Sequence, residues 1–210
     1  MKDIGKKKKI GVLASGGGSN MRAIMNTIDK GDINGEIIIV ISDNLQANAL
    51  NIAKERSIDT KCILPEDYSS RADFSTAIFN SLEPYNLDLL LLAGFMRVIT
   101  NELIIPFYGK ILNIHPSLIP SFCGKGYYGH HVHEAVIKKG VKFTGCTVHF
   151  VTEEVDGGPI IIQRIVPVSP DDTPDTVAAQ VLIEEHIAFP EAVKLFCDDE
   201  ISIDNINPLI

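Results

Sequence analysis

The chain has 210 residues, of which 45% are hydrophobic and 22% charged, and its formal net charge is −8 at pH 7. This length and composition are typical of one globular domain with a full core, so we expect residues 1–210 to form a single domain. The acidic balance argues against a nucleic-acid partner, because phosphate backbones are bound mainly by clustered Lys and Arg. No stretch reaches the roughly 18 apolar residues of a membrane span, which argues against a membrane partner.

The first half of the chain alternates short apolar runs with segments of helical period. Strands are predicted at 10–14, 35–42, 60–64 and 87–92, and helices at 20–28, 47–56, 71–82 and 101–107. This order predicts βαβ units and a parallel sheet buried on both faces. Four lysines at 6–9 precede the first strand, and we interpret them as a solvated lead-in because the apolar run is too short for a secretory signal.

The second half changes pattern. A strand over 108–112 leads into Asn113, two strands over 145–151 and 159–168 flank Asp156, and a helix over 175–195 is interrupted or kinked near Pro190. We therefore predict an α/β fold, a three-layer Rossmann-like open sheet that is mostly parallel with an antiparallel C-terminal hairpin element. Ligands of such sheets bind beyond the carboxyl ends of the strands, where 15–20, Asp43, 94–99 and 113–116 should share one crevice.

The first of these strand ends is a glycine-rich turn, Ser15-Gly16-Gly17-Gly18-Ser19-Asn20. Free backbone N–H groups and the helix dipole at such a turn favour a phosphate. A dinucleotide fingerprint requires glycine at position 21, which is Met21, and no Walker Gly-Lys-Ser/Thr follows. Two alternatives stay open: a tight turn capped by Ser19 or Asn20 with no ligand, and a nicotinamide site in which Asp43 binds a ribose hydroxyl.

Asn113 and His115 lie two positions apart at the end of a predicted strand, so their side chains point the same way. An amide NH₂ and a protonated imidazole can together bind a carbonyl oxygen as it becomes negative. Asp156 can hydrogen-bond the imidazole, favour its charged form and relay the proton that an attacking amine loses. The alternatives are a polar turn before Pro116 and a plain hairpin turn at Asp156.

No nucleophile of the protein is recognisable. Ser117 and Cys123 are close to His115 in sequence, but neither lies in a Gly-x-Ser-x-Gly elbow or a Cys-His arrangement. The residues therefore predict direct transfer between two bound substrates. The four cysteines lack a zinc spacing and no metal is expected; a reducing cytoplasm is the simplest location.

Taken in order, these motifs resemble the phosphoribosylglycinamide formyltransferases, enzymes of purine biosynthesis. The resemblance covers nearly the whole chain and is carried by SGGGSN at 15–20, LAGFMR at 92–97, LNIHPSLIP at 112–120, VHFV at 148–151, DGGPI at 156–160 and EH at 185–186. It implies transfer of a formyl group from 10-formyltetrahydrofolate, as co-substrate, to the amine of glycinamide ribonucleotide. Asn113, His115 and Asp156 are then the catalytic trio.

The resemblance also implies binding residues. Gly18, Ser19 and Asn20 would hold the ribose phosphate, and Glu185 would contact the glycinamide end. The folate site would be lined by Arg71, Met96, Arg97, Val98, Ile99 and Asn113. The alternatives are core packing for Met96 and Ile99 and a helix-start or salt-bridge role for Arg97.

The resemblance assigns no residue in the segment 122–133. Its glycines predict a mobile loop over the crevice, and His130, His131 and His133 are read as solvent-exposed residues at a helix start, not as metal ligands. His149 is predicted to be a hydrogen-bonded structural residue. We expect a monomer or weak homodimer. Other functions left open are a nicotinamide-dependent oxidoreductase, a 10-formyltetrahydrofolate hydrolase and a phosphoribosyl-binding module without chemistry.

Overall fold

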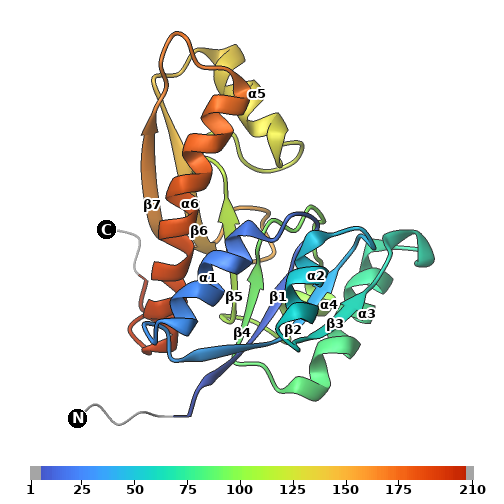
Figure 1. The fold of residues 1–210 in the computed structure, drawn as a ribbon. Helices are drawn as coiled ribbons and strands as arrows, with labels where there is room; N and C mark the ends of the chain where they lie inside the picture. Colours follow the sequence, from blue (N-terminus) through green and yellow to red (C-terminus); the bar gives the residue numbers. More distant parts are fainter. Residues whose placement is uncertain (1–5, 207–210) are drawn as a thin grey trace.

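The computed structural model describes residues 6–206, which are built around a seven-stranded sheet with helices on both faces (Figure 1). The strand order is β3-β2-β1-β4-β5-β6-β7. The strands are β1 (Lys8–Leu13), β2 (Gly35–Ser42), β3 (Asp59–Cys62), β4 (Leu89–Leu92), β5 (Ile111–His115), β6 (Phe143–Phe150) and β7 (Ile160–Pro167). Strands β1 to β5 pair in parallel, whereas β5–β6 and β6–β7 pair antiparallel. The predicted fold class is confirmed.

Helices cover both faces of the sheet and divide the core into two clusters. On one face α1 (Ser19–Asp29), α2 (Asn48–Glu55) and α6 (Pro174–Cys197) pack against the sheet, and α5 (His130–Lys139) packs against α6. On the other face lie α3 (Arg71–Leu82) and α4 (Asn101–Ile104), and two short 3₁₀ helices span Pro65–Asp67 and Glu83–Tyr85. The four leucines of β4 are all buried because both faces of this strand are covered.

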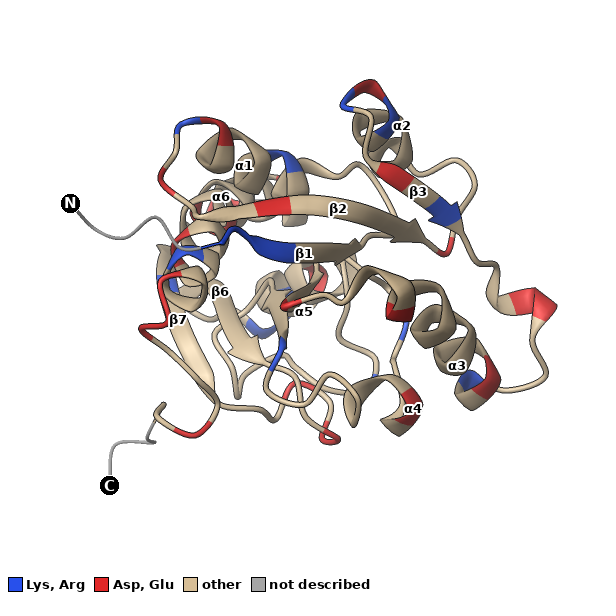
Figure 2. Cartoon of the chain, turned by 90° about the horizontal axis from the view of Figure 1, so that it is seen from below, with Lys and Arg blue, Asp and Glu red and all other residues tan. Residues whose placement is uncertain are grey.

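Acidic residues outnumber basic ones in the chain, and in Figure 2 both signs are seen on α3 and β3, while the start of β1 is basic. Within residues 6–206, no helix is both long enough and apolar enough to span a bilayer.

The strand that carries Asn113 begins and ends three residues later than predicted. Gly109 has a positive φ of 71° and Tyr108 is exposed, so the segment 108–110 is a turn and not a strand. Strand β5 then continues through His115. Asn113 and His115 therefore lie inside a strand, and the polar-turn alternative for them is wrong.

The segment predicted as a loop, 122–133, contains the first turn of α5. The helix turns Val132, His133 and Val136 inward, and it ends at Gly140 in the left-handed conformation. His133 is 6% exposed, so the prediction of an exposed side chain is wrong for this residue. The predicted interruption of the last helix is also wrong: α6 runs through Pro190, which is buried with Phe189 and Ala192.

Candidate active site

Two adjacent antiparallel strands bring the polar residues of the candidate site together. On β5 and β6, Asn113 is paired with His149 and His115 with Thr147. Residues directly opposite each other on paired strands point to the same face, so these four side chains lie together. Asp156 reaches them from the connection between β6 and β7, where it adopts a positive φ of 56°. Asp156 therefore lies in a hairpin connection, which was the alternative interpretation of this residue, and it is also part of the candidate site.

The ring of His149 fixes the orientation of Asn113. His149 Nδ1 lies 2.8 Å from the Phe150 carbonyl oxygen, so Nδ1 carries the hydrogen and donates it. Nε2 is left as an acceptor, and Asn113 Nδ2 donates to it at 3.1 Å. Burial lowers the pKa of His149, which keeps the ring neutral and suited to this pattern. An amide NH₂ has two hydrogens, so Asn113 retains one for a ligand in the cavity. The predicted hydrogen-bonded role of His149 is confirmed.

The second imidazole, His115, is buried and is held at both nitrogens. Its Nε2 lies 2.9 Å from the Phe122 carbonyl oxygen, which can only accept, so Nε2 carries a hydrogen. Its Nδ1 faces Asp156 Oδ2 at 3.7 Å. The same carboxylate accepts the backbone N–H of Gly124 at 2.8 Å, and its Oδ1 lies 3.7 Å from His149 Nε2. Asp156 is therefore positioned between two histidines, only one of which has a nitrogen free to exchange a proton with it.

A cavity of about 1080 Å³ opens over these residues. It brings together most of the residues singled out from the sequence: Asn20, Arg71, Met96, Arg97, Val98, Ile99, Asn113, His115, Asp156 and Glu185. Gly18 and Ser19 are not part of its lining and lie beside it, at the start of α1.

The glycine-rich turn is open where a ligand would approach. Gly18 is required by the fold, because its φ is 72° and an added Cβ would lie 2.9 Å from the Cα of Ala49. Gly16 and Gly17 are exposed, and a Cβ on either would meet nothing within 4 Å. Gly18 itself is the N-cap of α1, and no side chain caps the helix. The alternative of a turn capped by Ser19 or Asn20 is therefore wrong, and the first N–H groups of α1 are left for an anion.

Asn20 and Glu185 form a polar pair at the cavity wall. Asn20 Nδ2 donates to Glu185 Oε2 at 2.7 Å, and both residues are buried. Burial raises the pKa of Glu185 to about 7, and the hydrogen bond from Asn20 offsets only part of this effect. The buried Asn20 Oδ1 has no hydrogen-bond partner in the part of the chain that the structure describes. A buried acceptor without a partner is costly, and a ligand with N–H or O–H donors would satisfy it.

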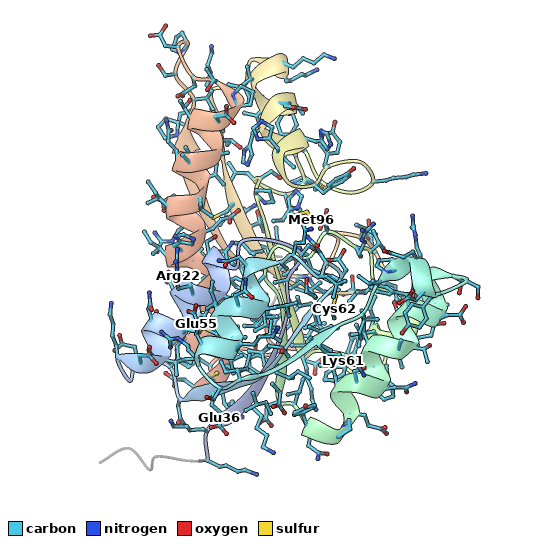
Figure 3. The ribbon with its side chains drawn as sticks, turned by 45° about the vertical axis from the view of Figure 1, so that its right-hand side comes forward. Arg22, Glu36, Glu55, Lys61, Cys62 and Met96 are labelled. Carbon is cyan, nitrogen blue, oxygen red and sulfur yellow. The ribbon has the colours of Figure 1, made fainter. Side chains whose placement is uncertain are left out.

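The segment 96–99 lines the cavity together with residues of α6. Met96 and Val98 are 45% and 44% exposed, so core packing does not explain them, whereas Ile99 is buried in the cluster with α3 and α4. Figure 3 shows Met96 between the loop before α5 and the sheet. Arg97 Nε donates to Asp43 Oδ2 at 2.6 Å, which confirms the salt-bridge alternative for Arg97. Because this bond occupies one oxygen of Asp43, the ribose-binding alternative loses support.

Comparison with known proteins agrees with this arrangement. The family model described as formyl transferase matches residues 8–193. The chain belongs to the formyl transferase family. A relative from Haemophilus influenzae called phosphoribosylglycinamide formyltransferase is 38% identical over 95% of this chain and 92% of its own length. The crystal structure of glycinamide ribonucleotide transformylase 1 from Symbiobacterium toebii has a TM-score of 0.87 and 42% identity, covering 93% of this chain and 90% of that one.

Some formyl transferase relatives are much longer than this chain. The trifunctional purine biosynthetic protein adenosine-3 of Gallus gallus is 42% identical over 94% of this chain, but the match spans 19% of that protein. A formyltetrahydrofolate deformylase from Pseudomonas syringae has a TM-score of 0.83 at 23% identity, which shows a shared fold alone.

Several groups at this candidate site were not singled out from the sequence. The main-chain carbonyl of Phe122 and the amide of Gly124 carry no residue signature, so sequence reasoning has no means of finding them. The contact of His149 with Asn113 depends on strand register, and only the alternation along 145–151 pointed toward it. Within residues 6–206, no group of three or more His, Cys, Asp or Glu is arranged to hold a metal ion. All four cysteines are free thiols.

Proposed function

We propose that the protein transfers the formyl group of 10-formyltetrahydrofolate to the amine of glycinamide ribonucleotide, giving formylglycinamide ribonucleotide and tetrahydrofolate. The observation that carries this proposal is the convergence of Asn113, His115 and Asp156 in one large cavity, together with membership in the formyl transferase family. A relative named phosphoribosylglycinamide formyltransferase and a solved structure named glycinamide ribonucleotide transformylase 1, each matched over nearly its whole length, support glycinamide ribonucleotide as the formyl acceptor.

The chemistry follows from the donors in the cavity. The neutral amine attacks the formyl carbon, and the carbonyl oxygen becomes an oxyanion that accepts hydrogen bonds from the free N–H of Asn113 and from Nδ1–H of protonated His115, whose Nε2–H is held by the Phe122 carbonyl. Asp156 takes up the proton that the amine nitrogen loses, directly or through water. The bond from carbon to the folate nitrogen then breaks as that nitrogen takes the proton held by Asp156, directly or through water, and tetrahydrofolate leaves with Asp156 again a carboxylate. No covalent intermediate with the protein forms.

Binding roles complete the proposal. The N–H groups at the start of α1, with Gly18, Ser19 and Asn20, hold the ribose phosphate, and this is supported by the uncapped helix and the open space at Gly16 and Gly17. Glu185 contacts the glycinamide end next to Asn20. Arg71, the segment 96–99 and Asn113 hold the folate, with exposed apolar surface at Met96 and Val98 for the pterin and a cation at Arg71 for its glutamate tail.

The test is to mix the protein with glycinamide ribonucleotide and a 10-formylfolate donor and to follow release of the deformylated folate by absorbance. We expect release only when the amine is present. Release at the same rate without the amine would identify a hydrolase, and no release in either case would contradict formyl transfer from this donor. Titration with NAD(H) serves as the control for the nicotinamide alternative, for which we expect no binding because Asp43 is paired with Arg97.

We further propose that the protein acts in the cytoplasm as a monomer or weak homodimer, without a nucleic-acid or membrane partner. The net charge of −8 and the four free cysteines support this. Sedimentation velocity over a range of protein concentrations tests the oligomeric state, and a stable dimer at submicromolar concentration would contradict it.

A further inference from the structure

The segment between His115 and Asp156 contains a buried hydroxyl that none of the roles above uses. Ser117 is fully buried, and its Oγ lies 2.6 Å from the Ser121 carbonyl oxygen and 3.2 Å from that of Phe122. A hydroxyl has one hydrogen, so the shorter contact is the principal hydrogen bond and the longer one is secondary. The Ser121–Phe122 peptide is thereby tied to the strand end that carries His115.

Ser117 is itself held in place from the neighbouring strand. Thr147 Oγ1 donates to the Ser117 carbonyl at 2.7 Å and accepts the Ile119 backbone N–H at 3.1 Å. Gln163 Nε2 on β7 lies 3.0 Å from the same Thr147 oxygen. The hydroxyl of Ser117 thus projects from a rigid support that spans β5, β6 and β7.

The backbone that this hydroxyl holds is strained. Phe122 has a φ of 50°, which is a costly conformation for an aromatic residue and persists only where the surroundings enforce it. In this conformation its carbonyl oxygen lies 2.9 Å from His115 Nε2, and two residues later the Gly124 N–H meets Asp156 Oδ2 at 2.8 Å. One short strained segment therefore contacts both His115 and Asp156.

The Phe122 carbonyl determines which ring nitrogen of His115 can exchange a proton. It accepts a hydrogen from Nε2, so the neutral ring carries its hydrogen there and Nδ1 is the basic nitrogen, facing Asp156 at 3.7 Å. If the carbonyl moved away, both tautomers would become accessible, and in one of them Nδ1 would already be occupied by hydrogen. In the protonated ring, Nδ1–H would then no longer be the one hydrogen left for the oxyanion, because Nε2–H would be free as well.

We propose that Ser117 is a positioning residue of the reaction: through the Ser121–Phe122 peptide it holds the Phe122 carbonyl against His115 Nε2 and so keeps Nδ1 as the nitrogen that exchanges protons beside Asp156. The inference rests on the proposed function for its effect on rate. Its effect on the ring of His115 is independent of which substrates are used.

The direct test is ¹⁵N NMR of the histidine rings in the wild-type protein and in Ser117→Ala, with His115 assigned from its loss in His115→Gln. We expect neutral His115 in the wild type to be the Nε2–H tautomer and Ser117→Ala to show a population of the Nδ1–H tautomer as well. Finding the Nδ1–H tautomer in the wild type would overturn the proposal without reference to any variant.

Kinetics supply the second readout, with Ser121→Ala as the matched control because Ser121 contributes only its carbonyl and its side chain is exposed. In Ser117→Ala we expect kcat to fall on the order of 10-fold, with both KM values and the melting temperature near those of the wild type. Ser121→Ala should match the wild type. If the Ser117→Ala variant keeps the wild-type kcat and its His115 stays purely in the Nε2–H tautomer, the positioning role is disproved. The role is also disproved if kcat falls in this variant while the His115 tautomer is unchanged.

These results separate the two proposals. If the wild type shows no formyl transfer but its His115 tautomer changes in Ser117→Ala, the proposed function fails and the structural coupling stands. If transfer occurs and the tautomer does not respond to Ser117→Ala, the proposed function stands and the positioning role fails.

Discussion

The parallel and antiparallel parts of the sheet place their polar groups in different ways. In the parallel part, β1 and β4 are apolar along their buried lengths, and the polar residues follow the strand ends, as in the glycine turn and at Asp43. In the antiparallel part, polar side chains stand inside the strands and meet across them, Asn113 opposite His149 and His115 opposite Thr147. The groups proposed to bind phosphate thus sit on a turn, whereas Asn113 and His115 sit on a paired strand and Asp156 on the connection between β6 and β7.

The difference follows from what each task requires. A phosphate is held by several backbone N–H groups, and a turn at a helix start supplies them without a demanding side-chain geometry. Proton transfer requires nitrogen and oxygen atoms at defined separations; strand pairing fixes Asn113 and His115, and the Gly124 N–H holds the Asp156 carboxylate beside them. The antiparallel part should therefore be far less tolerant of change than the glycine turn.

The largest effect is expected from Asp156→Asn, which keeps the shape of the side chain and removes the base. We predict a fall in kcat of about 10²- to 10⁴-fold, since general acid–base groups contribute that much. The melting temperature should change little. Glu154→Gln, an exposed change in the same connection, is the control and should keep its activity. Full activity in Asp156→Asn would remove the catalytic trio from consideration.

Backbone packing in the two parts is compared by Gly158→Ala and Gly16→Ala. A Cβ on Gly158 would lie 1.9 Å from the Phe150 carbonyl oxygen, so the strand β6 must shift to accept it. We predict a loss of at least about 3 kcal/mol in the free energy of unfolding, measured by urea denaturation. Gly16→Ala, which meets nothing within 4 Å, should have the stability of the wild type. Equal stabilities would show that the antiparallel part is as tolerant as the turn.

Glu185→Gln examines the contact between the two parts, because Asn20 belongs to α1 and Glu185 to α6. The pKa of Glu185 is about 7 in the folded protein, against 4.5 as its ordinary value. Between these pH values the folded state binds more protons than the unfolded state, so this residue lowers wild-type stability as pH rises from about 4.5 to 7.

Gln stays neutral and can still accept a hydrogen bond from Asn20. The free energy of unfolding of the variant, relative to that of the wild type, should therefore increase by about 2 to 3 kcal/mol as the pH rises from 5 to 8. Urea denaturation at several pH values measures this difference. A pH-independent difference between the two proteins would show that Glu185 does not retain its proton on folding.

The smallest effect is expected at the strand end of β2. Arg97→Ala removes the partner of Asp43, whose side chain is 3% exposed, while that of Arg97 is 52% exposed. We predict a loss of about 1 to 2 kcal/mol in the free energy of unfolding, since an unpaired buried carboxylate remains. Adding Asp43→Asn should restore part of the loss by removing the charge. No recovery in the double variant would mean that Arg97 stabilises the fold by contacts other than this ion pair.

Local pattern was enough to predict most elements of the fold. The bounds predicted for β2 and α3 coincide with those in the structure: β2 is an apolar run that ends before Asp43, and α3 begins directly after Ser70, whose side chain caps it. The order of strands and helices was sufficient to predict the parallel sheet. The position of Asp156 between two apolar runs was sufficient to predict the antiparallel element. The motifs also selected the cavity-lining residues, since side-chain type and strand ends are both visible in a sequence.

The sequence by itself thus determined the fold class, the family resemblance and the residues that meet in the cavity. Only the tertiary structure decided that β5 extends through His115, that α5 buries His133, and that His149 orients Asn113. It also decided that the Phe122 carbonyl selects the protonated nitrogen of His115. These features depend on cross-strand register and on main-chain carbonyls and amides, which every residue possesses and which no sequence pattern distinguishes.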